Sequence, residues 1–144
     1  MNLIIIGAII GGIIGLVISI PLIMKQKKIN KGDGKARQGK RFIKLVNFSG
    51  DSYKIGEKID NVLAANGYVS HKYGEEMVYR NGSGMATAGK FFKYTIKPDG
   101  ILIEAFVILF GVQESNLEGF TGIVSKKPLK KMVNEIIFMI VSEK

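Results

Sequence analysis

The sequence predicts an α+β protein: a single N-terminal transmembrane helix, a basic linker, and an antiparallel sheet of about four to five strands with two helices. Three observations lead to this prediction. Residues 3–24 hold no charged side chain, residues 25–44 are strongly basic, and the rest follows the order strand, helix, strands, helix. The 144 residues therefore divide into an anchor at 1–24, a linker at 25–41 and one domain at 42–144.

The N-terminal apolar run is long enough to cross a bilayer as a helix. Its 22 residues, Leu3 to Met24, rise about 33 Å at 1.5 Å per residue, close to a hydrocarbon core of about 30 Å. A secretory signal peptide is the alternative, and it would need a positive leading segment, a shorter apolar core and a small-residue cleavage site. Only Met1 and Asn2 precede this run, so we expect a retained single-pass anchor in the cell membrane.

Lysines beside the run predict its orientation. Lys25, Lys27 and Lys28 follow it, and basic flanks are retained on the cytoplasmic side. We therefore expect the N-terminus outside and the C-terminal domain in the cytoplasm. The absence of cysteine fits a reducing compartment, although it fits many others.

Small residues recur on one face of the expected anchor. Gly7, Gly11, Gly15 and Ser19 stand four residues apart, which places them on one stripe of a helix. Such a stripe lets a second helix approach closely, and close packing drives association in lipid. The alternative is a helix that tolerates glycine without a partner. We expect an interface with another copy of the chain or with another membrane protein.

The linker carries most of the net charge. Residues 25–44 hold nine basic side chains and one acid, a net charge of +8 out of +9 for the whole chain. Its role is either to fix topology alone or also to contact anionic lipid. Nucleic acid is disfavoured because no aromatic side chains are interleaved for base stacking. The candidate membrane-surface residues are Lys25, Lys27, Lys28, Lys31, Lys35, Arg37, Lys40 and Arg41.

The domain is expected to begin with a strand and a helix. Residues 42–48 alternate weakly and predict a short strand. Residues 55–66 have apolar side chains at helical spacing, with Asp51 or Ser52 as the cap and Gly67 as the stop.

A run of four strands is expected next. Pro98-Asp99-Gly100 is a tight-turn signal between the last two of them. Short connections favour an antiparallel meander with both helices on one face. The last strand is apolar on both faces, which predicts that the second face is covered by the glycine-rich loop, a partner or another copy. The four strands are expected at 68–73, 77–80, 91–97 and 101–109.

The C-terminal part is expected to form a loop and a helix. Residues 111–122 predict a loop that could include a short strand, and Pro128 is expected to open the helix. The apolar positions of this helix predict core packing, and its excess of apolar side chains and lysines is open to a partner or the membrane surface.

The search for chemistry finds no clear catalytic or metal site. Residues 84–90 have the spacing of a phosphate-binding loop, but Phe91 replaces the required Ser or Thr and a strand is expected after it. His71 is the single histidine and is expected at the surface, so without cysteine we expect no metal and no cofactor.

Three acids are weighed for acid–base chemistry. Glu75 and Glu76 are neighbours in the chain and are expected to be solvated, because strand neighbours point to opposite faces. Glu104 lies among apolar residues, and an ion pair with Lys93 or Lys97 is the expected reason.

Several stretches resemble a small domain found in many uncharacterised Gram-positive bacterial proteins, where it often follows a zinc ribbon or a membrane segment. They are Gly82-Ser-Gly-Met-Ala-Thr-Ala-Gly-Lys-Phe-Phe-Lys, Ile103-Glu-Ala-Phe, and Leu117-Glu-Gly-Phe-Thr-Gly with Lys126-Lys-Pro-Leu-Lys-Lys. The resemblance covers roughly the last 70 residues and implies a bacterial source and a recurring accessory domain. It implies no activity and no functional residue. The chain lacks cysteine, so the apolar helix takes the place of the zinc ribbon.

The sequence therefore predicts a membrane-anchored, non-enzymatic interaction domain that meets a protein partner or itself. The alternative is a small membrane-associated hydrolase or lipid-processing enzyme that uses Glu104 or Glu75.

Overall fold

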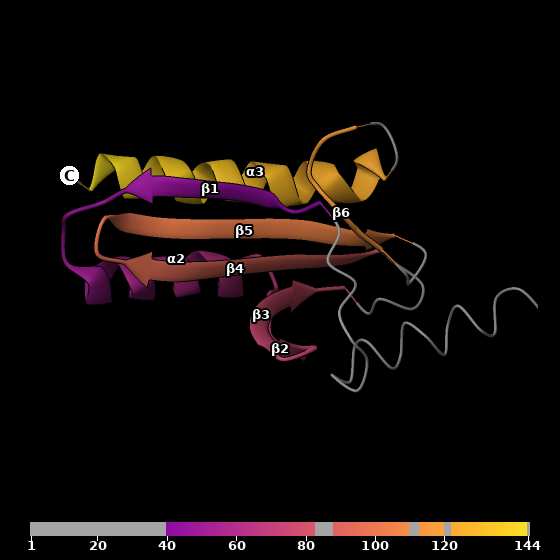
Figure 1. Ribbon diagram of the computed structural model, residues 1–144, viewed down its shortest axis with the longest axis horizontal. Coiled ribbons are helices and arrows are strands. Elements are labelled where there is room, and N and C mark those ends of the chain that lie inside the picture. Colours follow the sequence, from indigo (N-terminus) through magenta and orange to yellow (C-terminus); the bar gives the residue numbers. More distant parts are fainter. Residues whose placement is uncertain (1–39, 83–87, 110–112, 120–121, 144) are drawn as a thin grey trace, which may run out of the picture.

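The computed structural model describes residues 40–82, 88–109, 113–119 and 122–143. Within them, a six-stranded antiparallel sheet carries two helices on one face, which confirms the expected α+β domain (Figure 1). No helix in these ranges is both long and apolar enough to cross a membrane, and the anchor expected at 1–24 lies outside them. The elements are β1 Phe42–Asn47, α2 Ser52–Ala65, β2 Val69–Tyr73, β3 Glu76–Asn81, β4 Gly89–Lys97, β5 Gly100–Leu109, β6 Gln113–Ser115 and α3 Ile123–Ser142.

The sheet is a meander with its first strand displaced to the far side. Strands β2 to β5 follow one another as expected, and β1 pairs with β5, giving the order β1-β5-β4-β3-β2, with β6 also beside β5. The turn from β4 to β5 is the predicted one, since Lys97 pairs with Gly100 across Pro98 and Asp99. Gly100 has a positive φ of 155°, and a Cβ there would overlap the backbone oxygen of Val46 in β1. Glycine is therefore required at this position, where β1 runs beside the turn.

Helix α2 has the expected cap and stop but starts earlier. It begins at Ser52 rather than at residue 55, because the Asp51 side chain accepts hydrogen bonds from the amides of Tyr53 and Lys54, at 2.9 and 3.2 Å. Gly67 follows its end with a φ of 74°, as a helix stop requires.

Helix α3 begins at Ile123, so the prediction that Pro128 opens it is wrong. Pro128 lies one turn further in, where its missing N–H leaves one helical hydrogen bond unmade. Lys126 anchors the extra turn: its side chain is buried, and its Nζ donates to the backbone oxygen of Glu118 at 2.5 Å. This tertiary contact explains why the helix begins one turn before Pro128 rather than at it.

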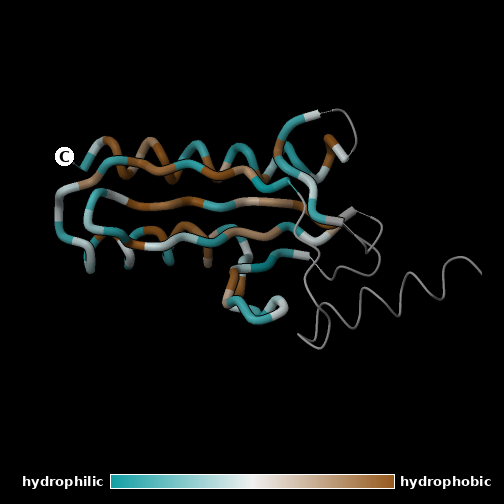
Figure 2. The backbone as a smooth tube through the Cα atoms, viewed as in Figure 1, coloured by the Kyte–Doolittle hydropathy of each residue, from teal (hydrophilic) through white to brown (hydrophobic). Residues whose placement is uncertain are grey.

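The main core lies between the sheet and the two helices. Strand β5 contributes alternate side chains, including Ile101, Ile103 and Val107, and α2 and α3 cover them with Ile59 and Ile136. All five side chains are fully buried. Figure 2 shows that hydrophobic residues continue along most of β5.

The second face of β5 is only partly covered. Strands β2 and β3 curl away from the plane of β4 and β5 (Figure 1), and their hairpin closes over one end of this face. A second, smaller core forms there, so the hairpin covers this part of the face. Its members are Tyr73, Val78, Phe91, Phe106 and Ile108. The glycine-rich loop lies partly outside the described residues.

Candidate functional site

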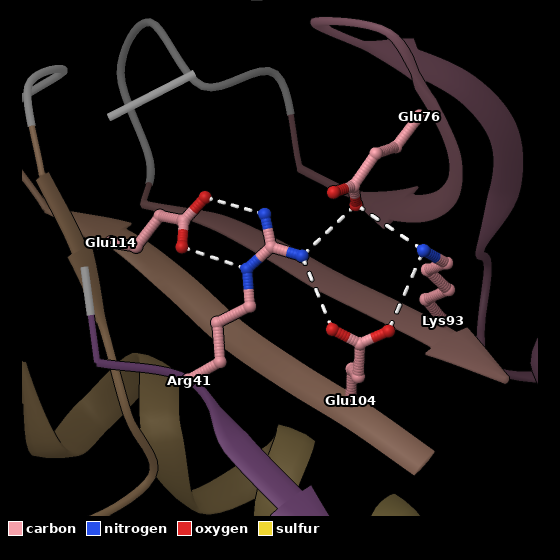
Figure 3. Close-up of polar contacts among 5 residues, drawn as sticks. All are labelled: Arg41, Glu76, Lys93, Glu104 and Glu114. Atoms are coloured by element: carbon pink, nitrogen blue, oxygen red, sulfur yellow. Dashed lines mark hydrogen bonds and ion pairs between the residues drawn. The ribbon is translucent and has the colours of Figure 1, made fainter. Parts of the chain in front are cut away.

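Arg41, the residue before β1, is held by three carboxylates (Figure 3). It makes two hydrogen bonds of 2.7 Å to Glu114 on β6, one of 2.9 Å to Glu76 on β3 and a longer one of 3.4 Å to Glu104 on β5. Lys93 on β4 completes the cluster, 3.5 Å from both Glu76 and Glu104. We call these five residues the charge cluster; its formal charge is −1, from two cations and three carboxylates.

The charge cluster closes the second core. The Arg41 guanidinium lies 4.3 Å from the centre of the Phe106 ring, and the Arg41 side chain is only 7% exposed. The hydrogen bond to Glu114 contributes most to raising the pKa of Arg41, while burial works in the opposite direction. Burial, with help from Glu114, raises the pKa of Tyr73 in the same core. Arg41 therefore stays charged, and the neighbouring phenol stays neutral.

The cations of the cluster outweigh burial at Glu76. Burial alone would raise its pKa, but Arg41 and then Lys93 outweigh burial and leave the pKa below the ordinary 4.5. A lowered pKa adds stability above the ordinary value, and that stability is lost as the pH falls through the lowered value. The cluster thus favours a folded domain at neutral pH.

The structure shows where each of the three acids considered in the sequence lies. The ion pair between Glu104 and Lys93 is confirmed, while Lys97 instead lies opposite Gly100. The prediction of a solvated Glu76 is wrong, because the curled hairpin brings it to Arg41, whereas Glu75 is exposed. Each carboxylate of the cluster has a cation, and in the described ranges no group of His, Cys, Asp or Glu could hold a metal ion.

Beyond the charge cluster the second face of the sheet is open. In the register of β1 and β5, Ile43 stands opposite Glu104, and Leu45 opposite Leu102, so these side chains share that face. Ile43 is 61% exposed and Leu45 41% exposed. No described strand pairs with the outer edge of β1. We call β1, with this unpaired edge and these two side chains, the open strand.

A shallow groove lies on the other side of the sheet, between α2 and β4. It encloses about 350 Å³, and Asp60 in it accepts hydrogen bonds from the hydroxyls of Tyr79 (2.7 Å) and Tyr94 (2.9 Å). Burial, followed by Asp60, raises the pKa of both tyrosines, so neither phenol is activated as a nucleophile. These contacts tie α2 to the sheet and present no reactive group.

The other predicted residues divide between exposed, buried and undescribed positions. Lys40 is exposed, whereas Arg41 is committed to carboxylates inside the domain. His71 is half-buried rather than at the surface, and its Nε2 has no hydrogen-bond partner within the described domain. Burial, followed by the charge of Arg80, lowers its pKa. The expected glycine stripe of the anchor and linker residues 25–39 lie outside the described residues.

Sequence reasoning predicted one ion pair of the charge cluster, between Lys93 and Glu104, and missed the rest of the cluster and the open strand. Arg41 was grouped with the linker because it ends a run of basic residues, and its three carboxylates are distant in sequence. The alternation of Ile43 and Leu45 was a usable signal, but it did not show that their face lacks a cover. No family model, no curated protein and no solved structure matches this chain.

Proposed function

We propose that the chain is a membrane-tethered, non-enzymatic interaction domain that pairs with a second copy through the open strand. The observation that supports this most is the exposure of Ile43 and Leu45 on a strand whose outer edge has no described partner. This strand follows the basic linker directly, and the linker follows the expected anchor. Pairing would thus take place just beyond the tether.

The open strand offers backbone groups to a partner strand. An edge strand exposes unpaired N–H and C=O groups, and proteins usually block it with charges, proline, a bulge or a cover. In β1 only Lys44 is charged, and the strand has no proline. The outer half of β4 is also unpaired by a described strand, but it holds Lys93 and Lys97. The open strand is therefore less protected than this half of β4.

A second copy satisfies this edge by symmetry. A two-fold axis normal to the sheet pairs β1 with itself antiparallel and keeps both open faces on the same side. A register with Lys44 opposite its counterpart is disfavoured by like charge, whereas Leu45 opposite Leu45 brings apolar side chains together. The pair then merges the two apolar surfaces into one.

The tether supplies what the small contact lacks. One six-residue strand per copy buries far less than the roughly 800 Å² per partner of a stable interface. A flexible linker, as the sequence predicts for residues 25–40, would span about 20–24 Å over 16 residues, and the two strand starts would lie about 20 Å apart in the pair. Two anchored copies can therefore meet at a high effective concentration.

Cysteine cross-linking tests the pairing, because the chain has no cysteine of its own. We expect Leu45→Cys in native membranes to form disulfide-linked dimers on mild oxidation. Ser70→Cys on the opposite edge strand β2 and Thr95→Cys on β4 are the controls, and both positions are exposed. Equal cross-linking at all three positions would indicate random collision and would contradict the proposal. Cross-links from Leu45→Cys to a different protein would assign the strand to another membrane protein.

A further inference from the structure

Helix α3 carries a basic and apolar stripe on the side away from the core. Val124, Lys127, Lys131 and Phe138 stand at positions i, i+3, i+7 and i+14, which is one face of a helix. Val124 is 82% exposed, Phe138 is 74% exposed, and both lysines are exposed. We call these four residues the outer stripe. The core side of α3, with Leu129, Met132, Val133 and Ile136, faces the sheet.

The fold does not explain this composition. Lys127, Lys130 and Lys131 are exposed, and Lys127 and Lys131 are an i, i+4 pair of like charge. Neither lysine of this pair makes an ion pair with any described residue. Glu135, four residues after Lys131, is exposed on the same face but makes no ion pair with a described residue. Large exposed side chains such as Phe138 add nothing to the core, so an external contact is the better explanation.

The stripe lies at the end of the domain where the linker enters. Arg41 is hydrogen-bonded to Glu114 on β6, and the chain runs from β6 to the start of α3. Figure 1 shows the starts of β1 and α3 near the same end of the sheet. A surface that meets the basic linker therefore lies within reach of the lysines of α3.

We infer that the outer stripe of α3 lies on the surface of an anionic bilayer. Lys127 and Lys131 meet lipid headgroups, and Val124 and Phe138, about 21 Å apart along the helix, insert at the interface. The inference rests on the proposed membrane tether, because a weak surface contact becomes effective when the domain is already held nearby. It adds a lipid contact within the folded domain to the one expected of the linker.

This placement agrees with pairing through the open strand. A two-fold axis normal to the sheet puts the helices of both copies on the same side of the pair. The outer stripes then face one plane, and the open faces point away from it. Two copies can therefore rest on one membrane while their strands are joined.

Lipid quenching measures the contact directly in the full chain. Val124→Cys and Phe138→Cys are labelled with an environment-sensitive fluorophore, with Thr95→Cys on the opposite face as the control. The chain is reconstituted into vesicles of phosphatidylcholine with or without phosphatidylglycerol, both containing brominated lipid. We expect at least twofold stronger quenching at positions 124 and 138 than at 95, only with phosphatidylglycerol, and loss of the difference near 0.5 M salt.

Charge reversal separates lipid contact from simple proximity. The double variant Lys127→Glu, Lys131→Glu should remove the excess quenching at positions 124 and 138 over position 95. Lys72→Glu on the exposed edge strand β2 should preserve that excess. Equal quenching at 95 and 124, no quenching at 124 in a retained chain, or a response to added RNA in place of lipid would each overturn the inference. Retention after an alkaline wash reports on the tether separately. If the chain is washed off, the tether fails, and the same labels mixed with anionic vesicles still decide the inference.

Discussion

The two faces of this sheet are built from the same strands but are completed differently. On the helix face, Ile101, Ile103 and Val107 of β5 are fully buried under α2 and α3. On the other face, the end of β5 that contains Phe106 is closed by the curled hairpin and Arg41. Near Leu102 no element of the described chain provides such a cover, and there Ile43 and Leu45 are exposed.

The difference shows how a charge cluster can mark the boundary of a core. Glu104 and Lys93 lie between the buried end and the open end of the same face. Ionised groups at that position stop the apolar core from extending, and they need solvent or partners on their outer side. The closed end therefore contributes to folding stability, whereas the open end leaves Ile43 and Leu45 exposed.

Removing Arg41 should break the closed end most strongly. In Arg41→Ala, Glu114 remains fully buried without its cation, which costs about 3–5 kcal/mol when a buried pair loses one partner. Arg41→Lys should recover part of the lost stability because it keeps the positive charge. Recovery should be incomplete because lysine cannot make both of the Arg41 hydrogen bonds to Glu114. Denaturant unfolding followed by tyrosine fluorescence measures both. Lys40→Ala is the neighbouring exposed control, and an equal loss there would refute the role of the cluster.

Displacing β1 should damage both faces. Gly100→Ala places a Cβ against the backbone of Val46, which cannot move without shifting β1, so we expect a loss of about 3 kcal/mol. Gly119→Ala is the matched control, since its φ is also positive at 82° but nothing lies within 4 Å of the new Cβ. Backbone strain alone should cost it about 1–2 kcal/mol. Equal losses in thermal unfolding would show that the overlap with β1 is not the cause.

A substitution at His71, on the hairpin, should have a smaller effect on stability than those at Arg41 and Gly100. His71 lies 6.5 Å from the Phe91 ring and has a buried Nε2 without a partner in the described ranges. Removing such an atom should stabilise the domain by about 1 kcal/mol, so His71→Phe should raise the melting temperature by several degrees.

The same variant should change the pH dependence. The pKa of His71 is lowered by burial, so its neutral form contributes stability above the ordinary value of 6.5, and that stability is lost as the pH falls through the lowered value. The parent should therefore lose stability more steeply than His71→Phe as the pH falls below 6.5. Parallel pH profiles would show that His71 does not titrate with unfolding.

Local signals predicted much of the fold and little of the site. Asp51 and Gly67 marked the ends of α2, and Pro98 and Asp99 marked the turn to β5, because caps and turns depend on neighbouring residues. The pair of Lys93 and Glu104 was also accessible, since the turn fixes its register.

The remaining features depend on contacts between distant segments. The place of β1 beside β5 and the curl of the hairpin are not encoded in any short window. Arg41 and Glu114 are 73 residues apart, so no local pattern joins them. The start of α3 was missed for the same reason, because the contact of Lys126 with Glu118 overrides the proline signal.

The position of Arg41 also has a mechanical consequence. The expected linker would join the domain at this residue, so a pull from the proposed membrane tether would arrive there first. Without side-chain contacts, that pull would peel β1 from β5 one residue pair at a time. Through Glu76, Glu104 and Glu114 it is instead shared among β3, β5 and β6. If the proposed membrane tether is present, the charge cluster would spread a pull on the domain over these strands and so protect β1 from separating from β5.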